Sequence, residues 1–155
     1  MAATSTNKQP LLVDNVLHYA VNLDTATNNG LDIAGTNTAV LLVDATTTDG
    51  AIIEDIYSLA RGSVEYKINL YISSANDYLR PNQAILIGTF SSATTAEEVT
   101  RWEKMPKSLA PVPQVGNESY NRALYIPKGK TLWAARNSTA NVTDAPILAC
   151  QGGWY

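Results

Sequence analysis

Apolar and polar residues alternate most clearly in the run Val64-Glu-Tyr-Lys-Ile-Asn-Leu-Tyr-Ile72. A period of two places successive side chains on opposite faces of a β-strand. The run therefore predicts a strand with one face in a core. The first face carries Val64, Tyr66, Ile68, Leu70 and Ile72, and the second carries Glu65, Lys67, Asn69 and Tyr71.

Seven further segments are predicted to be strands, because each is apolar or alternating and is bounded by Gly, Asn, Asp or Pro. Eight short strands separated by turns predict an all-β fold, either an antiparallel β-sandwich or a barrel. Ala39–Val43 is apolar on both faces, which predicts a central strand covered on each side, or on one side by a neighbouring subunit. The seven segments are Leu17–Leu23, Thr38–Thr46, Ala51–Leu59, Ala84–Phe90, Ala123–Ile126, Thr131–Arg136 and Pro146–Cys150.

The connections between these strands carry their own signals. Asp49-Gly50 lies between two apolar strands and predicts a tight hairpin. Thr95-Ala-Glu-Glu98 fits a capping box for a short helix, yet the surrounding segment Ser91–Lys104 also reads as a poor strand, so both states remain open. Pro106–Tyr120 contains three prolines and a glycine, which predicts a long exposed loop.

The two ends of the sequence differ in character. Residues 1–15 are small and polar and are broken by Pro10, which predicts an extended arm ahead of one domain over residues 16–155. The last six residues, Cys150-Gln-Gly-Gly-Trp-Tyr155, finish on two large aromatic rings. Such rings gain nothing in water, so we expect this segment to form a sheet edge or to dock in a subunit interface.

Composition narrows the classes of partner. A length of 155 residues fits one domain. Apolar residues make up 45% and charged residues only 16%, so part of an uncharged surface is expected to face a partner. A net charge of −3, with 11 Lys and Arg scattered along the chain, argues against nucleic-acid binding. The sequence contains neither the apolar core of a signal peptide nor a run of membrane-spanning length, so we expect synthesis in a cytoplasm and no membrane partner.

The sequence offers no catalytic or metal-binding constellation. His18 is the only histidine, which excludes multi-histidine metal sites and favours a packed or surface imidazole over a general base. Asp44–Gly50 lacks the alternating oxygen ligands of a calcium loop. Glu54 and Asp55 are adjacent and point to opposite faces of a strand, and Cys150 lies in an apolar run typical of a buried thiol. We therefore expect neither enzymatic activity nor a cofactor.

The segment from about Thr38 to Tyr155 resembles the small jelly-roll proteins encoded beside the major capsid protein in many tailed-phage genomes. The resemblance implies a jelly-roll-like sandwich and a head decoration, or cement, protein. Such a protein would sit as a homotrimer on the outer capsid surface of the virion, bridge capsomers of the major capsid protein and stabilise the expanded shell. The matching motifs are Glu65-Tyr-Lys-Ile-Asn-Leu-Tyr-Ile72, Ala84-Ile-Leu-Ile-Gly-Thr-Phe90, the hairpin Leu124-Tyr-Ile-Pro-Lys-Gly-Lys-Thr-Leu-Trp-Ala134, and Gly152-Gly153-Trp-Tyr155.

Two sets of contact residues follow from this resemblance. Apolar anchors of the arm and residues at the base of the Pro-rich loop are expected to touch the capsid, and large apolar side chains are expected to form the trimer interface. The capsid-contact set is Leu11, Leu12, Val13, Trp102 and Lys104. The trimer-interface set is Val40, Leu42, Trp133, Trp154 and Tyr155.

Other functions compete with this one. The first alternative is a carbohydrate- or receptor-binding jelly roll of a phage fibre or tail, in which aromatic rings form a stacking platform. Its weakness is that no fibrous or coiled-coil segment attaches the domain to a tail. A small hydrolase or lyase built around His18, and a cytoplasmic structural domain unrelated to viruses, are further alternatives.

Overall fold

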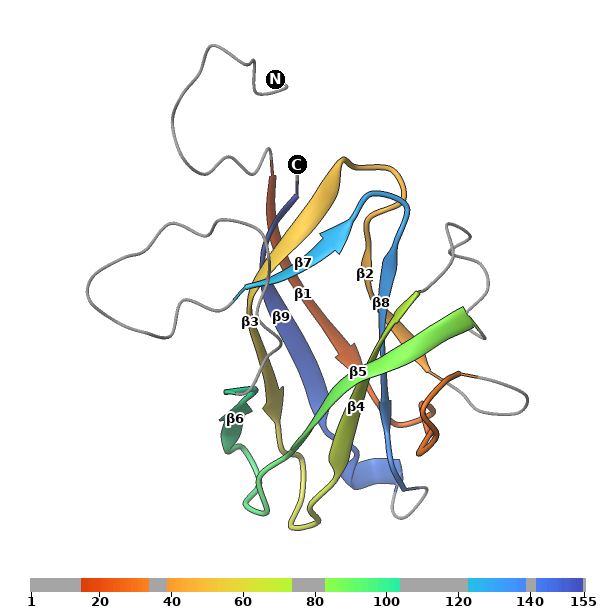
Figure 1. Cartoon of the computed structure of the whole chain (residues 1–155). Coiled ribbons are helices and arrows are strands. Elements are labelled where there is room, and N and C mark those ends of the chain that lie inside the picture. Colours follow the sequence, from red (N-terminus) through yellow and green to blue (C-terminus); the bar gives the residue numbers. More distant parts are fainter. Residues whose placement is uncertain (1–14, 34–38, 74–82, 104–122, 139–141, 155) are drawn as a thin grey trace.

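The computed structural model describes residues 15–33, 39–73, 83–103, 123–138 and 142–154. Within these ranges, strands form two antiparallel sheets that pack face to face (Figure 1). The described part of the chain contains one short 3₁₀ helix, η2 (Val142–Asp144), and no helix long and apolar enough to span a membrane. The predicted all-β sandwich is therefore confirmed.

The strands divide between a larger sheet A and a smaller sheet B. Sheet A has the order β1-β9-β3-β6, with β7 also paired to β3, and sheet B has the order β2-β8-β4-β5. All eight predicted strands are present, and a further strand, β6, lies in the segment whose state was open. Sheet A contains β1 (Asn15–Asn22), β3 (Gly50–Leu59), β6 (Val99–Arg101), β7 (Leu124–Pro127) and β9 (Ile147–Trp154). Sheet B contains β2 (Val40–Asp44), β4 (Lys67–Ser73), β5 (Ala84–Ser91) and β8 (Thr131–Arg136).

The hydrophobic core lies between the two sheets. Sheet A contributes Leu17, Ile53 and Ile56, while Ile68 and Leu132 come from sheet B, and all five are buried. Burying an aliphatic side chain of this size contributes about 1.5–3 kcal/mol. In a strand such as β4, the alternating sequence pattern therefore indicates which side chains face the core.

Strand β9 is an internal strand of sheet A, paired with β1 on one side and β3 on the other. Trp154 is therefore docked in a sheet, as predicted, but the expectation of a sheet edge is wrong. The backbone of β3 approaches so closely that a β-carbon on Gly152 would lie 1.9 Å from the Ile52 carbonyl oxygen. The β3–β9 register also shifts here, between Ile53 and Asp55. Only glycine fits this position without moving a strand.

Both predicted hairpins are wrong, because the strands around each turn belong to different sheets. Asp49-Gly50 lies between β2, which pairs with β8, and β3, which pairs with β6, β7 and β9. Gly129 lies between β7, which pairs with β3, and β8, which pairs with β2 and β4. Gly50 and Gly129 do adopt positive φ angles, of 138° and 78°. These glycines permit the turns, but each turn crosses from one layer of the sandwich to the other.

Strand β2 is the edge strand of sheet B, so the prediction that Ala39–Val43 forms a central strand is wrong. The register with β8 shifts between Leu41 and Val43, which is characteristic of a bulge. Leu42 and Val43 are consecutive and both are buried. The shift accounts for an apolar run that lacks alternation.

The segment that follows β1 covers part of the outer face of sheet B. The Tyr71 hydroxyl donates to the carbonyl oxygens of Asn28 (3.3 Å) and Gly30 (3.0 Å), and the Asn69 side-chain amide donates to the Asn28 carbonyl (2.7 Å). Asn69 and Tyr71 are consequently buried although they lie on the second face of their strand. Burial also raises the pKa of the Tyr71 hydroxyl, with a smaller contribution from the charge of Asp32.

A buried arginine fastens the start of this covering segment. Arg136 of β8 donates from Nε to the Leu23 carbonyl (2.9 Å) and from Nη2 to the Asp24 carbonyl (2.8 Å). Its guanidinium carbon lies 5.4 Å from the centre of the Tyr66 ring, within cation–π range. The hydrogen bonds and the ring compensate a charged group that would otherwise be costly to bury.

Replacing Gly152 by alanine should destabilise the fold, because the new β-carbon meets a backbone carbonyl between two paired strands. We expect Gly152→Ala to lower the free energy of unfolding by about 1–3 kcal/mol or more. Gln151→Ala, at the neighbouring exposed position, should stay within about 0.5 kcal/mol. Urea unfolding measures both, and equal stabilities would contradict the described approach of β3 to β9.

Candidate binding surfaces

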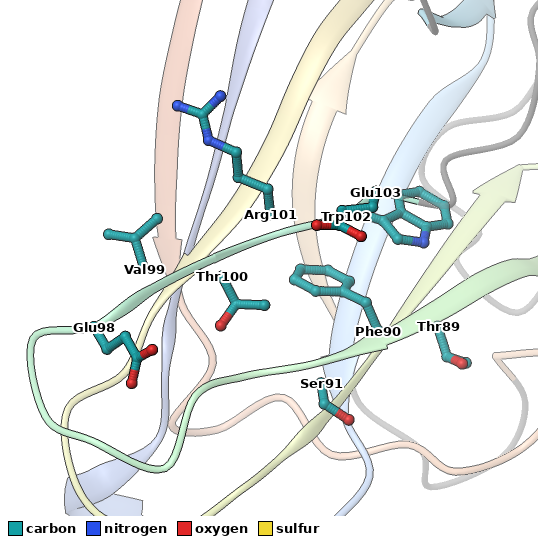
Figure 2. A pocket seen from close by; sticks show the side chains of 9 residues that line it. All are labelled: Thr89, Phe90, Ser91, Glu98, Val99, Thr100, Arg101, Trp102 and Glu103. Atoms are coloured by element: carbon teal, nitrogen blue, oxygen red, sulfur yellow. The ribbon is translucent and has the colours of Figure 1, made fainter. Parts of the chain in front are cut away.

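An open cleft of about 960 Å³ lies along one side of the sandwich, between β5 of sheet B and β6 of sheet A (Figure 2). Both are end strands of their sheets, and β6 is only three residues long. The two layers therefore leave an opening on this side. The cleft is lined by Thr89, Phe90, Ser91, Glu98, Val99, Thr100, Arg101, Trp102 and Glu103.

Trp102 fills the interior end of this opening. Its ring stacks on Phe90, with the ring centres 6.1 Å apart and the planes 16° apart. It also lies over Gly88, where an added β-carbon would come within 2.3 Å of the indole. The Trp102 backbone N–H donates to the Ile56 carbonyl of β3 at 2.9 Å. At 5% exposure Trp102 is a core residue, so its predicted role as a capsid contact is wrong.

The rim of the cleft is polar. Figure 2 shows Glu98, Thr100 and Arg101 on or beside β6, opposite Thr89 and Ser91 of β5. The Arg101 guanidinium forms an ion pair with Asp55 of β3, with Nη1 and Oδ2 3.3 Å apart. Hydroxyl and carboxylate groups of this kind can hydrogen-bond a polar ligand.

The outer face of sheet A, turned away from the core, is a second candidate surface. Ile56 and Cys150 are fully buried, so their chain neighbours Asp55, Tyr57 and Ala149 lie on the outward side of the strands. The register places Ala20, Ala149, Tyr57 and Arg101 opposite one another across four strands. This face therefore spans the whole width of the sheet.

Polar groups on the outer face of sheet A largely satisfy one another. His18 Nε2 and the Tyr57 hydroxyl share a hydrogen bond of 3.1 Å. Asp55 and Arg101 form the ion pair described above, and Glu54, at the register shift between Ile53 and Asp55, adds an exposed carboxylate. Val16 and Val99, at opposite ends of the sheet, are 81% and 50% exposed. The surface is consequently weakly charged with exposed apolar margins.

The predicted trimer-interface residues separate into two groups. Leu42 is 2% exposed and packs in the core, so its assignment to an interface is wrong. Val40, Trp133 and Trp154 are partly buried against the core and keep some exposed surface. The Trp133 indole N–H donates to the Thr131 hydroxyl at 2.8 Å. Tyr155 lies outside the described residues.

Other predicted sites also lie outside the described residues. They are the capsid contacts Leu11, Leu12, Val13 and Lys104, and the Pro-rich loop Pro106–Tyr120.

Sequence reasoning missed an apolar row on the outer face of sheet B. Leu41, Trp133, Tyr71 and Leu86 lie opposite one another across β2, β8, β4 and β5. Only Trp133 was singled out from sequence, by its size. Alternation in β4 placed Tyr71 on this face, but nothing in the pattern indicated which strands lie beside it.

Titratable groups elsewhere in the described structure suggest little reactivity. Burial raises the pKa of the Cys150 thiol to about 12, which makes the nucleophilic thiolate scarce at neutral pH. The described residues hold no group of three or more His, Cys, Asp or Glu side chains that could bind a metal ion. His18 is an exposed imidazole that shares a hydrogen bond with the Tyr57 hydroxyl.

Comparison with protein-family models, with curated proteins and with solved structures gives no match to this chain.

Trp102→Ala should destabilise the protein by about 3–5 kcal/mol, because it removes the side chain that closes the core beside the cleft. Arg101→Ala, next to it in the chain, removes a side chain that is 71% exposed, with its ion pair to Asp55, and should cost about 1 kcal/mol. Thermal and urea unfolding compare the two variants. A Trp102→Ala protein of unchanged stability would contradict the core role.

Stability should fall as the pH rises above 9. The Cys150 thiol ionises near its ordinary pKa of 9.0 when unfolded, but only near about 12 when folded. Between these values the folded state binds one more proton, so each pH unit removes up to about 1.4 kcal/mol. Urea unfolding from pH 8 to pH 11 should show a shallower decline for Cys150→Ala than for the wild-type chain. If the stability of both proteins falls equally with pH, the raised pKa of Cys150 does not cause the decline.

Proposed function

We propose that this chain is a phage head decoration protein with a jelly-roll fold, bound to the outer capsid surface of the virion after synthesis in the host cytoplasm. The order β1-β9-β3-β6 facing β2-β8-β4-β5 supports a jelly roll, which consists of eight strands in two sheets, with β7 as an addition. The resemblance of the quoted motifs to decoration proteins supports the assignment to a phage head.

The outer face of sheet A is the observation that carries this proposal. A stable protein interface disfavours unpaired charge at its centre. Here Asp55 pairs with Arg101 and His18 is hydrogen-bonded to Tyr57, so the exposed carboxylate of Glu54 is the charge that a protein partner would have to match. A broad sheet face of this composition suits a shallow protein lattice better than a nucleic acid or a deep ligand site.

Binding would stabilise the shell by linkage. A protein that binds the expanded lattice and not its precursor lowers the free energy of the expanded state by the free energy of its own binding. Contacts repeated over the shell, and bridging between capsomers, add multivalency. We also propose Leu11, Leu12 and Val13 as a second capsid contact, because a short apolar run can bury its side chains against a neighbouring subunit.

A homotrimer is the assembly we propose, with the row around Trp133 as its contact. Leu41, Trp133 and Leu86 retain exposed apolar surface on the outer face of sheet B. Val40, Trp154 and Tyr155 are the remaining candidates from the predicted set. Burying this row between protomers would leave the outer face of sheet A free for the capsid.

A charge placed on the capsid-binding face should weaken binding. We expect Val99→Glu, on β6, to reduce affinity for expanded shells at least about tenfold, because an unpaired carboxylate would be desolvated at the interface. Ile85→Glu is the matched control, since Ile85 is 53% exposed against 50% for Val99 but lies on β5 of sheet B. Co-sedimentation with shells that lack this protein measures both. Equal binding by the two variants would contradict this use of the face.

The cleft supports a second candidate function, the carbohydrate- or receptor-binding domain of a fibre or tail. Phe90 is partly exposed in a cleft that Glu98 and Glu103 also line, and a ring with carboxylates in the same cleft suits a sugar. A glycan array tests this function. Saturable binding that Phe90→Ala abolishes, together with no affinity for shells, would replace the decoration proposal.

A further inference from the structure

Three of the four sheet edges in the described structure are protected against pairing with another strand. Strand β6 has three residues and ends on Arg101, and β7, which shares the same edge of sheet A, has four residues and ends on Pro127. Strand β2 has five residues and a register shift next to β8. The first half of β5 is covered by the chain itself: the Leu86 N–H donates to the Leu31 carbonyl (2.8 Å), and the Ile33 N–H donates to the Ala84 carbonyl (3.1 Å). Short length, charge, bulges and covering segments are the usual means of blocking a sheet edge.

Among the residues that the structure describes, strand β1 has none of these protections. Its eight residues, Asn-Val-Leu-His-Tyr-Ala-Val-Asn, include no proline and no Asp, Glu, Lys or Arg. Its register with β9 runs without a shift from Asn15 opposite Trp154 to Asn22 opposite Ile147. Six of its eight residues are exposed. A long, regular and uncharged edge of this kind can accept another strand through backbone hydrogen bonds.

The core side of sheet A also ends abruptly at β1. Ile56, Cys150 and Tyr19 lie opposite one another across β3, β9 and β1. The first two are fully buried, whereas Tyr19 is 51% exposed. This row of apolar side chains therefore extends from the core to the edge of sheet A, where its last member, the Tyr19 ring, is half exposed to solvent. A further strand beside β1 would extend this row.

We propose that β1 pairs with β1 of a second copy of this chain, antiparallel, about a two-fold axis at Tyr19. The proposal does not depend on the decoration function. A two-fold axis perpendicular to the sheet leaves each side chain on the same face of the sheet in both copies. Because side chains alternate between the two faces along a strand, two residues that lie opposite each other across the axis must be separated by an even number of positions in the sequence. With the axis at Tyr19, Leu17 lies opposite Val21 of the second copy, and His18 lies opposite Ala20. The two Tyr19 rings meet between them.

A second copy suits this edge for two reasons. An uncharged strand meets no like-charge repulsion when it pairs with itself. The pairing also joins two apolar rows, each ending in Tyr19, so the rings lose their exposed surface to each other. One strand pair is a small interface, so the association of free molecules should be weak and visible mainly at high protein concentration.

Sedimentation velocity over a concentration series tests the proposal. As its concentration rises, the wild-type chain should associate into a species of twice the mass of the species seen at low concentration. Tyr19→Lys should raise the dissociation constant of this association at least about tenfold. Ile85→Lys is the control: its exposure is nearly the same, 53%, but its edge strand is already covered. It should associate like the wild type. Absence of this association, or equal association of all three proteins, would overturn the proposal and leave shell binding unaffected.

A cysteine at the axis tests the register. Tyr19→Cys is made in a Cys150→Ala background, because Cys150 lies directly opposite residue 19 within one chain and would compete for a disulfide. Mild oxidation should yield a covalent dimer, since facing residues of paired strands lie within disulfide distance. Ile85→Cys in the same background should remain uncrosslinked. Failure of the Tyr19→Cys protein to crosslink at concentrations where the wild type associates would overturn the two-fold pairing at Tyr19.

Discussion

Pairing of β9 on both sides is the constraint on which the rest of the structure depends. This strand joins β1 and β3, and all three strands contribute side chains to the sheet A half of the core. The backbone of β3 lies so close to Gly152 that a side chain larger than hydrogen would not fit there. Glycine at this position is therefore required for β3 and β9 to pair. The outer face of sheet A exists as a continuous surface only because β9 holds its neighbours in register.

The two sides of the sandwich, where the edges of its sheets lie, differ in how the core is closed. On the β5–β6 side, Trp102 stacks on Phe90 and closes the core, which leaves a shallow polar cleft outside it. On the β1 side no side chain of the described residues closes the core in this way, and Tyr19 remains half exposed. The scarcity of charge noted in the sequence is most evident on β1, which carries no Asp, Glu, Lys or Arg, while the outer face of sheet A carries Glu54 and the Asp55–Arg101 pair. Both surfaces suit contacts with other protein molecules.

Sequence patterns predicted the strands well but not their neighbours. Alternation along β4 encodes which side chains face the core, and this local property carries over to the fold. Asp49-Gly50 indicates that the chain turns, but not which strands pair on either side of the turn. In the structure the turn connects a strand of sheet B to a strand of sheet A, whereas the sequence predicted a hairpin within one sheet. Trp102 and Leu42 appeared to be contact residues because large apolar side chains serve cores and interfaces alike. Gly88, which makes room for Trp102, and the bulge beside Leu42 become apparent only once the strands are placed together.

The most direct test of a decoration role is the copy number of this chain in virions purified from the source of the sequence. Quantitative mass spectrometry would compare it with the major capsid protein. A lattice-wide decoration protein should be present within a few-fold of the shell protein, because each shell repeats its binding sites many times. A ratio of a small fraction would indicate a fibre or tail component, and absence from virions would contradict the proposed function.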